Sequence, residues 1–131
     1  MLANWAQQIA PANTLSISAL QAAVDLYSNP RAAGKEEAVD LYQQTFEAYQ
    51  GMQVLQPVPV CMAEYHSLVM EILGELASCF ENLGFVYESI DSGEDYSKSL
   101  TTANQHLTTA LRLSEDSIKE WDKANNIGSS E

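Results

Sequence analysis

The chain has 131 residues, of which 46% are hydrophobic and 18% charged, as is ordinary for one folded domain and too short for two separate cores. Six lysine and arginine residues against 18 aspartate and glutamate residues give a formal net charge of −12. This charge would repel nucleic acid phosphates, and no apolar run approaches the roughly 18 residues of a membrane span, so we expect no nucleic acid binding and no membrane insertion.

The N-terminal residues are predicted to form a short helical turn and then a helix. Pro11 is expected to end or kink the short segment, residues 1–12. The apolar side chains of that segment are Leu2, Trp5 and Ile9. The first main helix is predicted over residues 14–28, with Asn13 or Thr14 as its cap and Asn29-Pro30 as its stop. Its expected apolar stripe consists of Ile17, Leu20, Val24 and Tyr27.

Two further helices are predicted on either side of a proline-rich connector, residues 56–59. The second helix covers about residues 35–55. Its expected core face, with Val39 and Phe46 beside it, consists of Ala38, Tyr42, Thr45, Tyr49 and Met52. The third covers residues 59–90, with Pro59 at its first position, where a missing N–H group does no harm. Its heptad core positions are Tyr65, Val69, Ile72, Leu76, Cys79, Leu83 and Val86.

A turn at residues 91–93 is predicted to precede a fourth helix that reaches about residue 125, with a frayed tail at residues 127–131. Ser92 and Asp95 have the spacing of a helix capping box. The expected core residues of this helix are Leu100, Ala103, Leu107, Ala110, Leu111 and Ile118. Because no segment shows strand-like alternation, the sequence predicts an all-α fold. We expect a single domain over residues 1–131, an antiparallel four-helix bundle with a short extra N-terminal helical turn.

The sequence lacks the motifs of common catalytic and metal sites. His66 and His106 are each preceded three residues earlier by alanine, so neither belongs to a Glu-x-x-His metal motif, and both are expected to be partly exposed. Cys61 and Cys79 are 18 residues apart on one predicted helix, too far apart to form a disulfide with each other. We therefore expect no enzyme activity, no catalytic residues, no metal and no cofactor.

Tyrosines are the most distinctive aromatic residues, and two interpretations of them stay open. A tyrosine ring with its hydroxyl group can line a polar-tipped ligand pocket between helices. The alternative is a position at the edge of the core, with the hydroxyl reaching water. The candidate ligand-binding residues are Tyr42, Tyr49, Tyr65 and Tyr87.

The acidic charge is concentrated in the middle of the chain, because residues 36–97 contain no lysine or arginine. Helices in this region cannot use Glu–Lys pairs and must be stabilised by packing. The acidic face is either a solvated surface or a surface that docks a partner. Trp5 is expected to cover the ends of the longer helices and to meet Trp121 there. The candidate interaction surface consists of Glu64, Glu71, Glu75, Glu81, Glu88, Trp5 and Trp121.

Two resemblances add expectations about compartment and function. From Pro57 onward, the proline-rich connector, Cys61, His66, an apolar helix and an acidic turn resemble helical-bundle domains of bacterial secreted proteins and lipoproteins of unknown function. That resemblance implies a location outside the cytoplasm. Residues 20–50, with Ala38, Leu41 and Tyr42 after Gly34, resemble the helical hairpins of tetratricopeptide and microtubule-interacting-and-transport modules, which implies peptide binding.

These observations favour a non-catalytic helical interaction module that binds another protein or associates with itself, for example as a homodimer. The first alternative is a small-molecule-binding bundle with a tyrosine-lined pocket. The second is a domain of a bacterial surface protein, secreted or anchored, whose signal segment is absent from this chain. Two unpaired cysteines and the lack of a signal-like segment in residues 1–10 favour the cytoplasm.

Overall fold

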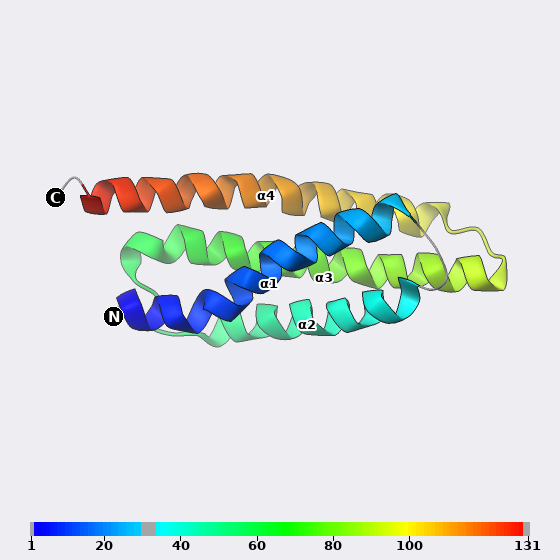
Figure 1. The fold of residues 1–131 in the computed structure, drawn as a ribbon, viewed down its shortest axis with the longest axis horizontal. Helices are drawn as coiled ribbons and strands as arrows, with labels where there is room; N and C mark the ends of the chain where they lie inside the picture. The colour runs from blue at the N-terminus through cyan, green and yellow to red at the C-terminus, as the bar shows by residue number, and fades with distance from the viewer. Residues whose placement is uncertain (1, 30–33, 130–131) are drawn as a thin grey trace.

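The computed structural model describes residues 2–29 and 34–129, with side chains for residues 3–29 and 34–123. It contains α1 (Leu2–Ser28), α2 (Lys35–Val54), a short 3₁₀ turn η2 (Val60–Met62), α3 (Ala63–Ser92) and α4 (Ser97–Ser129). The described chain contains no strand, and its long helices pack side by side (Figure 1). The prediction of an all-α, antiparallel four-helix bundle is confirmed.

The N-terminal turn and the first predicted helix are one continuous helix, so the prediction that Pro11 ends the segment is wrong. Pro11 lies inside α1, where it cannot donate to the carbonyl group of Gln7. Both residues are exposed, so water can satisfy that carbonyl. The other expected outcome, a kink at Pro11, agrees with the course of α1 (Figure 1). The first part of α1 packs near the end of α2, and the rest of the helix crosses α3 obliquely.

The buried stripe of α1 differs from the predicted one. Ile17 is 70% exposed, whereas Ala19 and Ala23 are fully buried together with Leu26. Small alanine side chains let the backbone of α1 approach α3 closely, so this interface does not need large apolar residues. Asn13 is not a cap, because it lies within α1 and its side-chain oxygen accepts a hydrogen bond from the Tyr65 hydroxyl group at 2.8 Å.

The predicted faces of the middle helices are confirmed. Ala38, Thr45 and Met52 of α2 are buried, and Tyr42 and Tyr49 on the same face are half-buried. All seven heptad positions predicted for the third helix are buried in α3. α3 itself begins slightly later than predicted, because η2 follows Pro59 and precedes it.

The turn between α3 and α4 uses Gly93 rather than the predicted capping box. Gly93 has a φ of 78°, a left-handed conformation that suits glycine, and the N–H of Glu94 donates to the carbonyl of Ser89 at 2.9 Å. Asp95 caps α4 by accepting from the Ser97 N–H at 3.0 Å. This backbone hydrogen bond lowers the pKa of the Asp95 carboxyl group.

The last helix is longer than predicted, and its predicted core face is confirmed at Ala103, Leu107 and Ala110 but not further along the helix. It continues to Ser129, so the prediction of a frayed tail from residue 127 is wrong for residues 127–129, and residues 130–131 lie outside the described chain. Leu111 and Ile118 are exposed instead of buried, because the core stripe continues through Leu113 and Ser117.

α3 is the central helix of the bundle. Among the described residues it packs along α2, along α4 and against α1, whereas α2 and α4 hardly touch each other. Three side-chain hydrogen bonds join α1 to α3 among the described residues. Those from Trp5 to His66 and from Tyr87 to the carbonyl of Leu26 each span 61 residues, and that from Tyr65 to Asn13 spans 52. Trp5 and Leu26, near the two ends of α1, thus bond His66 and Tyr87, near the corresponding ends of α3, so the two helices run in the same direction, with α1 crossing one face of α3 (Figure 1).

Candidate functional site

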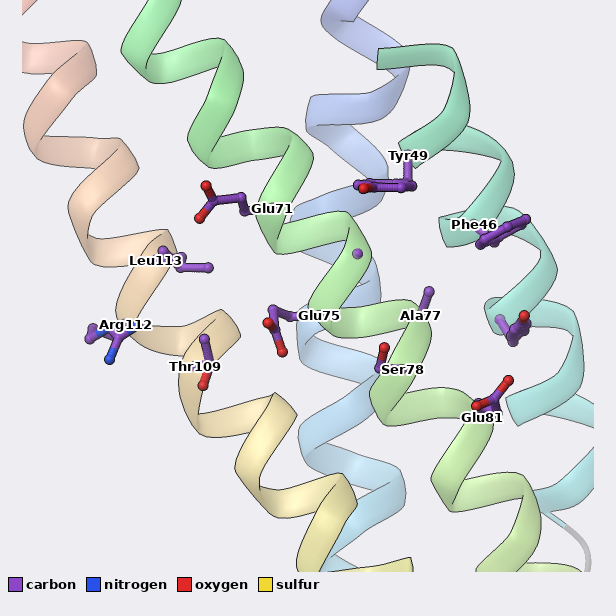
Figure 2. A pocket seen from close by; sticks show the side chains of 12 residues that line it. Phe46, Tyr49, Glu71, Glu75, Ala77, Ser78, Glu81, Thr109, Arg112 and Leu113 are labelled. Carbon is purple, nitrogen blue, oxygen red and sulfur yellow. The ribbon is translucent and has the colours of Figure 1, made fainter. Parts of the chain in front are cut away.

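A groove runs along the face of α3 that α1 does not cover. It has a volume of about 540 Å³, and residues of α2, α3 and α4 line it. Figure 2 looks onto this face, with α4 on one side of α3, α2 on the other and the blue ribbon of α1 behind. The groove therefore exists because α2 and α4 flank α3 without closing over it.

Aromatic side chains form the α2 wall of the groove. Tyr42, Phe46 and Tyr49 are spaced by four and three residues and project from one side of the helix. The rings of Tyr42 and Phe46 are stacked, with centroids 5.8 Å apart and an interplanar angle of 5°. Such a wall offers flat ring faces to an occupant, including a cationic one.

The floor of the groove is made of small residues of α3. Gly74, Ala77 and Ser78 have small side chains, which leave the groove open above them. The ring of Tyr49 lies close to Gly74, because a Cβ added to Gly74 would be 3.3 Å from that ring. Gly74 therefore permits close packing between α2 and α3. The α4 wall consists of Thr109, Arg112 and Leu113 (Figure 2).

The groove is acidic and poorly compensated. Glu71, Glu75 and Glu81 line it from α3, and Arg112 is the only lysine or arginine among its lining residues. Among the side chains that the structure describes, the only contact within 4 Å between an acidic and a basic side chain joins Glu75 to His106, whose ring nitrogen Nδ1 lies 2.6 Å from the carboxylate. Glu71 and Glu81 thus have no ion-pair partner there.

A second hollow of about 380 Å³ continues the groove along α2 and α3. The two hollows share Tyr42 and Glu81 as lining residues, so they are contiguous. The second hollow is lined by Lys35, Val39, Tyr42, Gln43, Phe80, Glu81, Gly84, Phe85 and Glu88. Its Val39 and Phe85 side chains are 43% and 49% exposed, which makes this half more apolar than the first.

The four tyrosines predicted as ligand-binding residues do not share one pocket. Tyr42 and Tyr49 line the groove. Tyr65 lies on the other side of the bundle, in a cleft of about 250 Å³ between α1 and α4. Tyr87 is fully buried, and its hydroxyl group donates to the carbonyl of Leu26 at 2.8 Å. A pocket formed by all four is therefore excluded by their positions.

The predicted interaction surface is divided in a similar way. Of its five glutamates, Glu71, Glu75 and Glu81 line the groove, Glu88 lines the second hollow, and Glu64 is exposed outside both. Trp121 is 39% exposed and lines the same cleft as Tyr65, and the centroids of their rings are 5.1 Å apart. Trp5 is only 1% exposed, so its assignment to a surface is wrong.

Trp5 is instead the centre of a buried cluster at one end of the bundle. Its indole N–H donates to Nδ1 of His66 at 3.1 Å, and Nε2 of His66 lies 2.9 Å from the carbonyl oxygen of Met52. Because Nδ1 accepts, Nε2 must carry the proton and donate it to that carbonyl. The ring of Tyr65 contacts both tryptophans, whereas the expected direct contact between Trp5 and Trp121 is not among the ring contacts of the described residues.

The histidines and cysteines do not form a metal site among the described residues. No group of three or more His, Cys, Asp or Glu side chains there is arranged to hold a metal ion. His66 is 8% exposed, so the expectation of partial exposure is wrong for it, because Trp5 and Met52 satisfy both of its nitrogens. Likewise, no described helix is long and apolar enough to cross a membrane.

The two cysteines are expected to differ sharply in reactivity. Cys61 is exposed, whereas Cys79 is buried and desolvation raises its thiol pKa to about 12. Treatment of the native protein with a thiol-reactive chromophore at pH 8 should therefore modify one thiol per chain, and unfolding should release the second. The Cys61→Ser variant should show no fast reaction, and rapid modification of Cys79 in that variant would contradict its burial.

Sequence reasoning found the acidic residues of the groove but missed its walls and floor. Phe46, Gly74, Ser78 and Arg112 were not predicted as site residues. One usable signal was present: Glu71, Gly74, Ser78 and Glu81 recur at helical spacing, a stripe of α3 without a large apolar side chain. Such a stripe indicates a face that neighbouring helices of the same chain flank without covering it completely.

The fold and the groove together define an all-α bundle of four long helices with one open, acidic face over its central helix. Comparison with known proteins gives no relative: no protein family model, curated protein or solved structure matches the chain significantly. The resemblance to secreted helical-bundle domains therefore stays a prediction.

Proposed function

We propose that this protein is a non-catalytic interaction module whose groove over α3 docks a cationic segment of another protein. The observation that carries the proposal is the open face of α3, where Glu71 and Glu81 have no ion-pair partner among the described side chains. A basic segment would compensate these carboxylates, and its ammonium or guanidinium groups could also stack on the aromatic wall of α2.

Charge also favours a different protein over a second copy of this chain. A second copy would carry the same net charge of −12, so two acidic surfaces would repel each other on approach. The sequence has only six lysine and arginine residues to offset that repulsion. We therefore propose a hetero-association, driven in part by electrostatic attraction.

Binding of a flexible cationic peptide tests this function. The probe is a fluorescein-labelled 12-residue peptide of Lys, Ser and Gly, titrated with the protein and followed by fluorescence anisotropy at low salt. Each exposed ion pair contributes about 0.2–1 kcal/mol, so the double variant Glu71→Gln/Glu81→Gln should weaken binding by up to about thirtyfold. Raising the salt concentration should also weaken binding of the wild-type protein.

The matched control removes the same charge outside the groove. Glu47 on α2 and Glu64 on α3 are exposed and line neither hollow, so Glu47→Gln/Glu64→Gln should change affinity by less than about twofold. Equal weakening by the two double variants would show attraction by net charge alone and would overturn the proposal. Tighter binding of choline than of the peptide at the groove would instead support the small-molecule alternative.

A further inference from the structure

The two contiguous hollows form a trough along α3 that is long enough to hold a helix of several turns. The trough extends along α3 from Glu71 to Glu88. Seventeen residues at about 1.5 Å each correspond to about 26 Å, or nearly five helical turns. Between Glu71 and Glu81 the trough is flanked by α2 and α4, and from Glu81 to Glu88 it is lined by α2 and α3 alone. The exposed sides of neighbouring helices are the surfaces against which a further helix packs in a bundle.

Backbone hydrogen bonding favours a helical occupant over an extended one. The walls and floor of the trough are the sides of α2, α3 and α4, whose backbone N–H and C=O groups are already bonded within their helices. An extended segment buried there would leave its own backbone groups without partners, which is unfavourable. A helix satisfies these groups internally and presents only side chains.

The chemistry of the trough also specifies the faces of that helix. Val39, Phe46 and Phe85 are each at least 40% exposed along it and offer apolar contact. An added Cβ at Gly84 would meet nothing within 4 Å, so the floor there is open to an incoming side chain. Carboxylates occur along the whole length, from Glu71 to Glu88, where they can meet basic residues that flank an apolar stripe.

We infer that the occupant of the trough is a basic amphipathic helix of about 17 residues, which packs along α3 as a fifth helix of the bundle. This inference rests on the proposed function and adds the conformation, length and side-chain pattern of the partner segment. The apolar residues of the partner helix recur at i, i+3 or i+4 and i+7, and they contact the aromatic and aliphatic side chains of α2 and α3. Its lysines and arginines lie beside that stripe and pair with the glutamates.

Three designed peptides and one pair of glycine variants test the inference. The first peptide has 18 residues of Leu, Ala and Lys with leucines on one helical face, the second has the same composition with the leucines scattered, and the third carries two central prolines that block helix formation. The first should bind at least tenfold more tightly than the others. Its circular dichroism should also show a gain of helix upon binding.

The glycine variants separate this inference from the proposed function. Gly84→Leu fills the apolar half of the trough and should weaken binding of the amphipathic peptide at least tenfold, which is far more than it weakens binding of the flexible Lys-Ser-Gly peptide. Gly51→Leu is the matched control, since Gly51 is an exposed helical glycine with open space around it and lies outside the trough. Thermal unfolding of both variants verifies that they remain folded.

The outcomes are distinct. If the three 18-residue peptides bind equally, or if Gly84→Leu changes none of their affinities, the helical occupant is wrong and a cationic segment of another conformation remains possible. If Glu71→Gln/Glu81→Gln has no greater effect than its control on any peptide, both the inference and the proposed function fail. A wild-type dimer in sedimentation that the amphipathic peptide dissociates would identify a second copy as the occupant and overturn the inference.

Discussion

Replacement of Trp5 by alanine is expected to destabilise the protein by about 3–5 kcal/mol, the range typical for removal of a buried tryptophan. The side chain is 1% exposed and packs among residues of α2 and α3, so its removal leaves a cavity. It also removes the indole N–H, which leaves Nδ1 of His66 as a buried acceptor without its donor. Urea unfolding at neutral pH, followed by circular dichroism, measures the change.

Two matched variants separate the contributions to this effect. Trp5→Phe keeps most of the apolar area but removes the indole N–H, so it should lose about 1–3 kcal/mol. Trp121→Ala makes the same chemical change as Trp5→Ala at a side chain that is 39% exposed and should have a smaller effect. A loss for Trp5→Ala no larger than that for Trp121→Ala would show that the buried cluster does not stabilise the fold.

Replacement of Gly34 by alanine is expected to destabilise the protein by about 1–3 kcal/mol, as overpacking of a core does. Gly34 precedes α2 and has a φ of −79°, which alanine adopts without strain. The added Cβ would lie 2.9 Å from Cε2 of Tyr87 and 3.3 Å from a methyl group of Leu26. Tyr87 cannot easily yield, because it is fully buried and its hydroxyl group bonds the carbonyl of Leu26.

Gly84→Ala is the control for this prediction, and it should stabilise the protein rather than destabilise it. Gly84 lies inside α3, and an added Cβ there meets nothing within 4 Å. Alanine should therefore stabilise the helix by up to about 1 kcal/mol. Thermal or urea unfolding of both variants measures the difference, and stabilisation by Gly34→Ala would contradict the close contact with Tyr87.

The sequence pattern predicts helices well where large apolar residues make the core. α3 packs against three other helices, so its core positions are filled by residues such as Leu76 and Leu83, and their heptad spacing is visible. The buried face of α1 includes Ala19 and Ala23, which a hydrophobic pattern hardly distinguishes from surface residues. The apolar pattern of α1 includes the exposed Ile17 instead, so the predicted stripe lies partly on the wrong face.

Long-range partners explain why the burial of His66 and the shape of the groove could not be predicted. Nothing near His66 in the sequence indicates that Trp5, 61 residues earlier, donates to its ring. The groove depends on two helices that fail to meet, a property of their packing angles rather than of any local pattern. The acidic residues of the site could be predicted because a charged stripe on α3 has helical periodicity.

The hydrogen bonds between α1 and α3, which span 52 to 61 residues, have a consequence for the order of folding. α2, α3 and α4 can pair with their neighbours in the chain through short connections, whereas α1 must pass over α2 to reach α3. Loop-closure entropy grows only slowly with length, by about 0.6 kcal/mol for each doubling, so this longer closure weakens the native state little. Contacts that are distant in sequence nevertheless form slowly, and α1 is therefore expected to dock last, onto a hairpin array that has already formed.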